Sequence, residues 1–291
     1  MKIKKTASDI ILDIFCYSIV IAMCITVVLP FWNLLTQSIT PKSELSLKFS
    51  WFPKKVDISA WKMITQSSYM WLCMKNTVAR TILGTVISLT LTTTYAYPLS
   101  RKDFPAGKFL FSILMFTMLF SGGLIPTYLN ISDLGMMDTI WALVIPGSLS
   151  AFNCILLKNF FSQLPNELME AASIDGANDI LILFKIVLPL SLPILATLTL
   201  WSLVGTWNEW FNALLYINDR DKYVLQIMIR ELQTTVEALT EGGAGADSSA
   251  TPPSEAIIAA SNLFVILPIL CTYPFLQKYF VGGLTVGGVK G

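Results

Sequence analysis

Six long apolar stretches separated by shorter polar ones run along the chain, at residues 14–35, 78–99, 109–129, 139–160, 188–217 and 256–277. Each is close to or longer than the roughly 20 residues that an α-helix needs to cross the hydrocarbon core of a bilayer. Inside lipid a segment must satisfy its own backbone hydrogen bonds, which favours helices. The pattern therefore predicts an all-α polytopic membrane protein with six transmembrane helices, formed by residues 1–291 as a single domain.

The first apolar stretch follows three lysines, Lys2, Lys4 and Lys5. It is longer than the apolar part of a signal peptide, and no small-residue cleavage site follows it. We therefore expect it to be retained as the first span.

The short loops predict the orientation of these spans in the membrane. The loop after the second span carries Arg101, Lys102 and Lys108, whereas the loop at residues 130–138 carries no basic residue. Basic residues concentrate in short cytoplasmic loops. Both termini and the segment between the fourth and fifth spans are therefore expected in the cytoplasm.

Two longer segments are expected outside. Residues 36–77 place Trp51, Trp61, Tyr69 and Trp71 among polar residues. This mixture suits an interfacial helix around residues 59–72, although direct contact with a partner is an alternative. Residues 218–255 begin polar and end in a Gly, Ala and Ser tract, which predicts either a tether or a segment that orders only against an external partner.

Composition excludes several classes of function. The 291 residues are 54% hydrophobic and 13% charged, against about 25% charged in soluble domains. Histidine is absent, which excludes a Ser-His-Asp triad and argues against a zinc or haem site. The net charge of +1, with scattered Lys and Arg, argues against a nucleic-acid partner. The five cysteines form no CxxC motif and indicate no disulfide framework.

The polar segment at residues 164–193 is the strongest candidate for a functional element. Pro165 suits the first turn of a helix over residues 166–174, and Gly176 can adopt the left-handed conformation that ends it. Asp179 is predicted to cap a second helix that runs to Pro189. The expected product is a helix, a sharp turn and a second helix.

Seven residues of this segment resemble the EAA loop of permease subunits of bacterial ABC importers, the cytoplasmic loop that grips the ATPase: Glu170, Ala171, Ala172, Gly176, Ile186, Leu188 and Pro189. The two alanines would let a partner backbone approach closely, while Glu170 and Asp175 offer charges to an Arg or Lys across an interface. For the Glu-Ala-Ala triplet alone, an ordinary solvated helix is the alternative, since these residues are good helix formers. The coupling loop implied by the resemblance spans residues 164–189.

The resemblance extends over nearly the whole chain. Residues 104–217, the ending YPFLQKYFVGGLTVGGVKG and the six-span layout are similar to the permeases of carbohydrate importers related to the maltose system, in particular the branch for complex oligo- or polysaccharides. The resemblance implies a type I ABC importer permease fold, a second permease, two ATPase subunits and an extracytoplasmic sugar-binding protein. The tail at residues 281–291 resembles one that reaches between the ATPases, with a frayed terminus as the alternative.

No GxxxxGK[ST] P-loop occurs in the chain, so ATP and magnesium would bind the separate ATPase subunits. We therefore expect no catalytic residue, cofactor or metal site here, and a non-catalytic subunit whose spans rock between inward and outward openings.

Polar and aromatic residues of the fifth span are candidates for a substrate path: Trp201, Trp207, Asn208, Glu209, Trp210 and Asn212. An ionisable residue within a span indicates function by default. Asn208 and Asn212 lie one helical turn apart and are predicted to share a face with Trp201. In the alternative interpretation the tryptophans form an interfacial belt and Glu209 is solvated.

Three alternative functions agree less well with the sequence. The same mechanism could serve a non-sugar solute such as peptides or glycerophosphodiesters. A secondary transporter would need a coupling-ion site, for which Glu209 is the one clear intramembrane acid. A membrane enzyme would need a pair of carboxylates or a nucleophile with a base, and no such pair is placed around a substrate.

Overall fold

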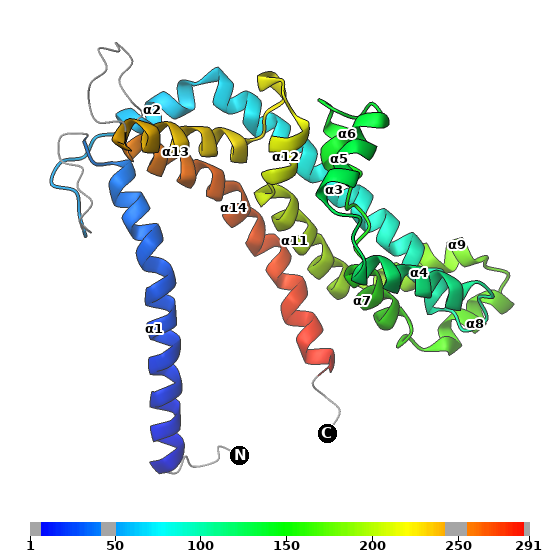
Figure 1. Cartoon of the computed structure of the whole chain (residues 1–291). Helices are drawn as coiled ribbons and strands as arrows, with labels where there is room; N and C mark the ends of the chain where they lie inside the picture. The colour runs from blue at the N-terminus through cyan, green and yellow to red at the C-terminus, as the bar shows by residue number, and fades with distance from the viewer. Residues whose placement is uncertain (1–6, 42–50, 242–254, 288–291) are drawn as a thin grey trace. The chain divides into compact units, whose positions relative to one another are not determined.

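The computed structural model is helical throughout the residues it describes, 7–41, 51–241 and 255–287, with no strand among them. It forms two compact units. The first comprises Met1–Ser67 and Ile229–Leu267, and the second comprises Ser68–Met228 and Pro268–Gly291. The predicted all-α class is confirmed (Figure 1).

Among the described residues, two helices are each long and apolar enough to cross a membrane. In α1 (Ala7–Ser38) the segment Ser8–Ser38 has a mean hydropathy of 2.5. In α14 (Glu255–Gly287) the segment Glu255–Phe275 has a mean hydropathy of 2.0. The predicted tail at residues 281–291 begins within α14, and its last residues, 288–291, lie outside the described chain, as do the N-terminal lysines.

The two segments that were predicted to lie outside contain more helix than expected. The predicted helix over residues 59–72 is divided: α2 (Ser59–Gln66) ends at Ser67, which is extended, and α3 (Ser68–Ser100) follows. The second segment contains α13 (Leu225–Glu241), which was not predicted. Its Gly- and Ser-rich stretch at residues 242–254 lies outside the described part of the chain.

The long helix α3 organises the second unit. It packs against α7 (Ala151–Phe161) and α11 (Leu192–Asn208). At Gly84 a Cβ atom would lie 3.3 Å from the Thr206 side-chain methyl, so glycine is what lets α3 and α11 approach this closely.

The third and fourth predicted spans are interrupted by turns. A 115° bend at residues 120–123 separates α4 (Gly107–Leu119) from α5 (Leu124–Asp133). A β-turn separates α6 (Ile140–Val144) from α7, with Pro146 and Gly147 at its centre and the Ser148 N–H donating to the Ile145 carbonyl over 3.2 Å. Gly147 has φ +74°, as the third residue of a type II turn requires.

The fifth predicted span is also broken. Residues 179–190 and α11 meet at an 83° bend at Ser191, and α11 ends before Glu209. After this second break α12 (Phe211–Tyr216) begins. By length and composition the described chain holds two spanning helices, or up to four if each bent pair is one span, so the count of six stays a prediction.

Both ends of α3 are tied to other parts of the second unit. Toward its start, the Leu225 N–H donates to the Thr77 hydroxyl, and Asn76 donates to the Tyr223 carbonyl. Toward its end, Tyr97 belongs to a cluster with residues of α7 and α11. Thr77 and Tyr97 are about 30 Å apart along the helix axis, which is about the thickness of a hydrocarbon core.

The loop before α6 is tied to the segment after α12 through Asp138. Its main-chain N–H donates to the Tyr216 carbonyl, and its carboxylate accepts from the N–H groups of Asn218 at 2.5 Å and Asp219 at 3.0 Å. These hydrogen bonds, led by the one from Asp219, hold the pKa of the Asp138 carboxyl below its usual value. Asp138 has φ +56°, which Asp and Asn tolerate best among residues other than glycine.

Asp138→Asn should therefore lower thermal stability at neutral pH by weakening these contacts. Because the native pKa is depressed, the stability that the ionised carboxylate contributes is complete above the unfolded pKa of about 4 and is lost as pH falls through the lower native value. The gap between wild type and variant in detergent should narrow only below about pH 4. Asp133→Asn, at an exposed acid of α5, is the control, and a gap independent of pH would contradict the assignment.

Candidate functional site

The segment at residues 164–190 forms the predicted helix, turn and second helix. The first helix, α8, spans Asn166–Ile174 as expected, and Gly176 has φ +85°. The second is continuous through α9 (Asp179–Ile182), a π-type turn η2 (Leu183–Val187) and α10 (Leu188–Leu190).

Two predicted details of this segment were wrong. Pro165 precedes the first turn of α8 with φ −58° and ψ 122°, so it flanks the helix instead of lying within it. The cap of the second helix is Asn178, whose side-chain oxygen accepts from the Leu181 N–H at 2.8 Å. Asp179 is the first helical residue and points its carboxylate elsewhere, toward Tyr97 and Arg101.

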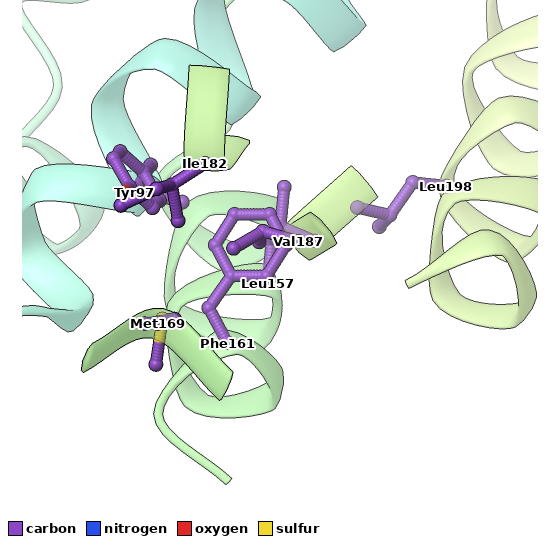
Figure 2. Packing of buried hydrophobic residues seen from close by; sticks show 8 residues of the cluster. Tyr97, Leu157, Phe161, Met169, Ile182, Val187 and Leu198 are labelled. Carbon is purple, nitrogen blue, oxygen red and sulfur yellow. The ribbon is translucent and has the colours of Figure 1, made fainter. Parts of the chain in front are cut away.

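A buried apolar cluster holds the segment against the helices beneath it (Figure 2). Met169 of α8, Ile182 of α9 and Val187 of η2 belong to the same cluster as residues of α3, α7 and α11. Burying side chains of this size contributes roughly 1.5–3 kcal/mol each relative to exposure. The segment is therefore fastened to the body of the second unit.

The π-type turn aligns two of these anchors. Ile182 and Val187 are each 1% exposed although they lie five residues apart. In a regular α-helix they would point about 140° apart, whereas the wider turn brings them to one side. The widening directly precedes Pro189, which lacks the backbone N–H of a regular helix.

Arg101 adds a polar anchor that the sequence analysis treated only as an orientation signal. Its guanidinium lies 3.7 Å from the Asp179 carboxylate and 5.8 Å from the centre of the Tyr97 ring. It also donates to the Met169 sulfur at 2.8 Å. Arg101 thus joins the end of α3 to both helices of the 164–190 segment.

The predicted coupling residues fall into two groups. Glu170, Ala171, Asp175 and Gly176 are exposed. Ala172, Ile186 and Leu188 are partly buried and pack on the cluster. Pro189 is exposed within α10.

One exposed apolar side chain escaped the sequence analysis. Ile174, at the end of α8, is 86% exposed. A large aliphatic side chain this exposed beside Glu170 and Asp175 forms an apolar contact point within a charged surface. The sequence offered a signal for this exposure, because Ile174 directly precedes Asp175 and Gly176, where the helix was predicted to end.

A second candidate site is a polar cavity of about 220 Å³ in the second unit. It lies where α3, the turn between α6 and α7, and the end of α11 meet. Its polar lining residues are Arg80, Ser88, Ser148, Ser202, Thr206, Glu209 and Asn212. Gly147 and Gly205, which also line it, are exposed, so the cavity is open to the surface of this chain.

Arg80 and Glu209 form an ion pair beside this cavity. The guanidinium also donates to the Glu209 main-chain carbonyl at 2.9 Å, and the other carboxylate oxygen accepts from the Asn212 N–H at 2.6 Å. The Arg80 side chain is 3% exposed and that of Glu209 is 27% exposed. The pair therefore supplies partners to the backbone on both sides of the break between α11 and α12.

The structure brings together some of the predicted substrate-path residues. Glu209 and Asn212 line the cavity. Trp207 is buried, and Trp201 is half exposed with its ring 6.1 Å from that of Phe152. Trp210 packs edge-on against a neighbouring phenylalanine, and Asn208 is exposed.

The predicted shared face of Asn208 and Asn212 was wrong, because the helix breaks at Glu209 between them. The sequence analysis did not pair Arg80 with Glu209. The sequence could have indicated this ion pair, since each is the one charged residue of its apolar stretch and the two charges are opposite.

Comparisons of this chain with a family model and with known proteins agree on one family. The family model described as "Binding-protein-dependent transport system inner membrane component" matches residues 14–285. Protein LplC of Bacillus subtilis (strain 168) is 42% identical over 265 residues, covering 91% of this chain and 90% of LplC. The polygalacturonan/rhamnogalacturonan transport system permease protein YtcP of the same organism is 38% identical, covering 96% of this chain and 98% of YtcP.

A solved structure agrees with the fold. One chain of a bacterial ABC transporter involved in the import of the acidic polysaccharide alginate superposes with a TM-score of 0.83. It is 29% identical, and the match covers 96% of this chain and 100% of that chain.

Neutralising one member of the Arg80–Glu209 pair should lower the stability of the folded protein. Glu209→Gln leaves an almost fully buried cation and should lower the free energy of unfolding by roughly 3–5 kcal/mol. Arg80→Gln should lower the free energy of unfolding by less, because the remaining Glu209 carboxylate retains some access to solvent. Thermal unfolding in detergent would measure both.

In the double variant Arg80→Gln/Glu209→Gln, the free energy of unfolding should fall by less than the sum of the two single decreases. Neither charge is then left without its partner. Lys222→Gln is the control, because its ion pair with Asp219 is solvent-exposed at 3.2 Å and worth at most about 1 kcal/mol. Additive losses would show that the two charges do not interact.

Proposed function

Because the chain belongs to the family of binding-protein-dependent transport system inner membrane components, we propose that it is the permease subunit of an ATP-driven importer for oligo- or polysaccharides. Two relatives with high coverage support the substrate class, since one is named for polygalacturonan and rhamnogalacturonan and the other imports alginate. The observation that carries the mechanism is an exposed surface on the 164–190 segment, whose underside is anchored in the apolar cluster.

The proposed topology has six spans, with both termini and the 164–190 segment in the cytoplasm. The distribution of Arg and Lys in the short loops supports this orientation. The spacing of about 30 Å between the two ends of α3 supports a position across the bilayer. The Asp138 loop then lies on the outer side and the 164–190 segment on the inner side.

The exposed part of the 164–190 segment is the proposed ATPase-binding surface. Glu170 and Asp175 would pair with cations of the ATPase, Ala171 would allow close backbone approach, and Ile174 would enter an apolar pocket. Ala172, Ile186 and Leu188 hold this surface in position from beneath, and the exposed Pro189 belongs to the surface itself. The ATPase is a separate subunit, because this chain has no P-loop.

Transport would follow from moving this surface as one body. When ATP draws two ATPase subunits together, each carries the segment bound to it. The apolar cluster and Arg101 transmit that displacement to α3, α7 and α11. A loosely attached loop would absorb the same motion without moving the spans.

The proposed assembly contains further partners. A second permease would complete the pathway, two ATPases would supply the energy, and an external sugar-binding protein would deliver the substrate. The family description includes dependence on a binding protein, which supports the last of these. Glu209 and Asn212 are the best supported substrate-path residues, since both line the polar cavity.

The function is tested by reconstituting the chain with these partners in vesicles. A labelled oligosaccharide should accumulate when ATP is present on the ATPase side and should not accumulate with a non-hydrolysable analogue. Accumulation driven by a proton gradient without ATP would contradict an ATP-driven importer. ATP-dependent uptake of peptides with no uptake of any sugar would keep the mechanism and overturn the substrate class.

The ATPase-binding surface has its own test. Ile174→Asp removes an apolar contact worth roughly 1.5–3 kcal/mol when buried, and should weaken ATPase binding at least about tenfold. Thermal stability should not change, because Ile174 is exposed in the free chain. Titrating labelled ATPase against the purified permease would measure the affinity.

Leu134→Asp is the matched control for Ile174→Asp. Leu134 is also a largely exposed aliphatic residue, near the Asp138 loop at the opposite end of the second unit. Equal loss of ATPase affinity in both variants would remove Ile174 from the interface.

A further inference from the structure

A larger cavity lies at the other end of α3 and shares no lining residue with the cavity beside Arg80. Its volume is about 520 Å³, within the range of pockets for small molecules. One wall is a single face of α3, formed by Thr94, Tyr97, Pro98 and Arg101 at helical spacing. The loop at residues 103–105 and the segment that begins α9 form the rest. This space is the α3–α9 cavity.

The α3–α9 cavity carries its charged groups at one end. Arg101, Asp103 and Asp179 gather where α3 ends, and the Arg101 guanidinium lies 3.7 Å from the Asp179 carboxylate. Thr94 lies two helical turns earlier, about 10 Å away along the axis. In the proposed topology the charged end is therefore at the level of the lipid headgroups, and Thr94 is at the inner edge of the hydrocarbon core.

The face of α3 that carries Thr94 continues outward without cover. Thr90 and Leu91, one turn earlier, are both exposed. The Thr94 hydroxyl donates to the Thr90 carbonyl at 2.7 Å, and the Thr90 hydroxyl donates to the Val86 carbonyl at 2.8 Å. Because these hydroxyls are satisfied within the helix, they need no water. An acyl chain can lie along this face, which favours a lipid over a water-soluble ligand.

Arg101 has free capacity to bind a phosphate. The Asp179 carboxylate at 3.7 Å is beyond the length of a normal hydrogen bond, and the Met169 sulfur is a weak acceptor. The other side-chain N–H groups of Arg101 have no acceptor among the described residues. The side chain is 31% exposed, so a ligand can reach it. Phosphate oxygens match the planar fork of a guanidinium.

The carboxylates beside Arg101 select a headgroup that also carries a cation. Asp103 is exposed and makes no ion pair with any described residue. The Asp179 side chain is 73% exposed, and one of its two oxygens accepts from the Tyr97 hydroxyl at 3.3 Å. A purely anionic headgroup would place its phosphate beside two uncompensated carboxylates, and like charges repel. A primary amine next to the phosphate offers them N–H donors.

We propose that the α3–α9 cavity binds the headgroup and the adjoining chain of one amine-bearing phospholipid of the inner leaflet. The phosphate lies at Arg101, the amine lies between Asp103 and Asp179, and one acyl chain runs past Thr94 along α3. The bound lipid contacts both α3 and α9, the two elements that Arg101 joins. The proposal depends on the orientation of α3 in the membrane and on no particular transported solute.

Native mass spectrometry of the purified full chain tests the site, with the affinity for the first bound lipid as the readout. Phosphatidylethanolamine should bind at least about tenfold more tightly than phosphatidylglycerol, whose headgroup has no amine. Thr94→Trp should weaken binding of phosphatidylethanolamine at least about tenfold by filling the path of the acyl chain. Thr94 is exposed, so the substitution leaves the packing of the fold intact.

Thr127→Trp is the matched control for Thr94→Trp. Thr127 of α5 is also exposed, lies outside the cavity, and donates to the carbonyl of Gly123, four residues earlier, at 2.7 Å. Its affinity for phosphatidylethanolamine should stay within about twofold of wild type. Wild-type affinity in Thr94→Trp would overturn the cavity as the binding site.

Headgroup selection is tested by reversing one charge. Asp103→Lys should lower the ratio of phosphatidylethanolamine affinity to phosphatidylglycerol affinity at least about tenfold, because a cation replaces the partner of the amine. Asp133→Lys, at an exposed acid outside the cavity, is the control and should leave the ratio within about twofold of wild type. Equal shifts in both variants would mean that overall charge sets the preference, which would overturn the assigned headgroup contacts.

Free phosphoethanolamine separates a lipid from a soluble ligand of the same headgroup chemistry. It lacks the acyl chain whose burial contributes to binding, so even a large excess should leave phosphatidylethanolamine bound. Displacement by phosphoethanolamine would overturn the lipid as the occupant. These measurements use neither ATPase nor sugar, so a negative result would leave the proposed importer intact.

Discussion

A helix that breaks within an apolar segment must find partners for the backbone groups that the break exposes, because lipid offers none. In this protein the requirement is met at the break after α11 by two side chains. Arg80 donates to the Glu209 carbonyl, and the Glu209 carboxylate accepts from the N–H of Asn212. The ion pair between the two side chains holds both ends in place. The polar cavity exists because this break is held open, and so the proposed substrate chemistry depends on a structural requirement of the backbone.

Both candidate sites depend on the same helix. Arg80 projects from α3 to the break in the fifth apolar stretch, while Tyr97 and Arg101 at its other end support the 164–190 segment. A continuous helix is stiff over this length. In the proposed mechanism, a displacement of the 164–190 segment therefore reaches the cavity through a short and direct connection. Coupling still requires two discrete arrangements of the packed helices, because stiffness alone transmits motion without selecting a state.

The sequence predicted elements whose signals are local. The helix of α8 and the left-handed glycine after it follow from helix propensity and from the absence of a Cβ atom, and both were confirmed. The breaks were harder to predict, because no proline marks the one at Glu209 and because it is stabilised by Arg80, which lies 129 positions away. The same holds for α13, whose first N–H is bound by the hydroxyl of Thr77, 148 positions earlier. At Pro146 and Gly147 the turn signal was present, but hydropathy outweighed it.

The π-type turn in the 164–190 segment allows two chain lengths to present the same anchors. Ile182 and Val187 meet the same cluster although they lie five residues apart, because the wide turn takes up one residue more than a regular helix. Deleting one residue between them would restore a regular α-helix, in which the two side chains would lie about 40° apart and still face the cluster. Leu188 would keep its place on the cluster as well. Among homologous chains this stretch can therefore differ by one residue in length without losing its anchoring contacts.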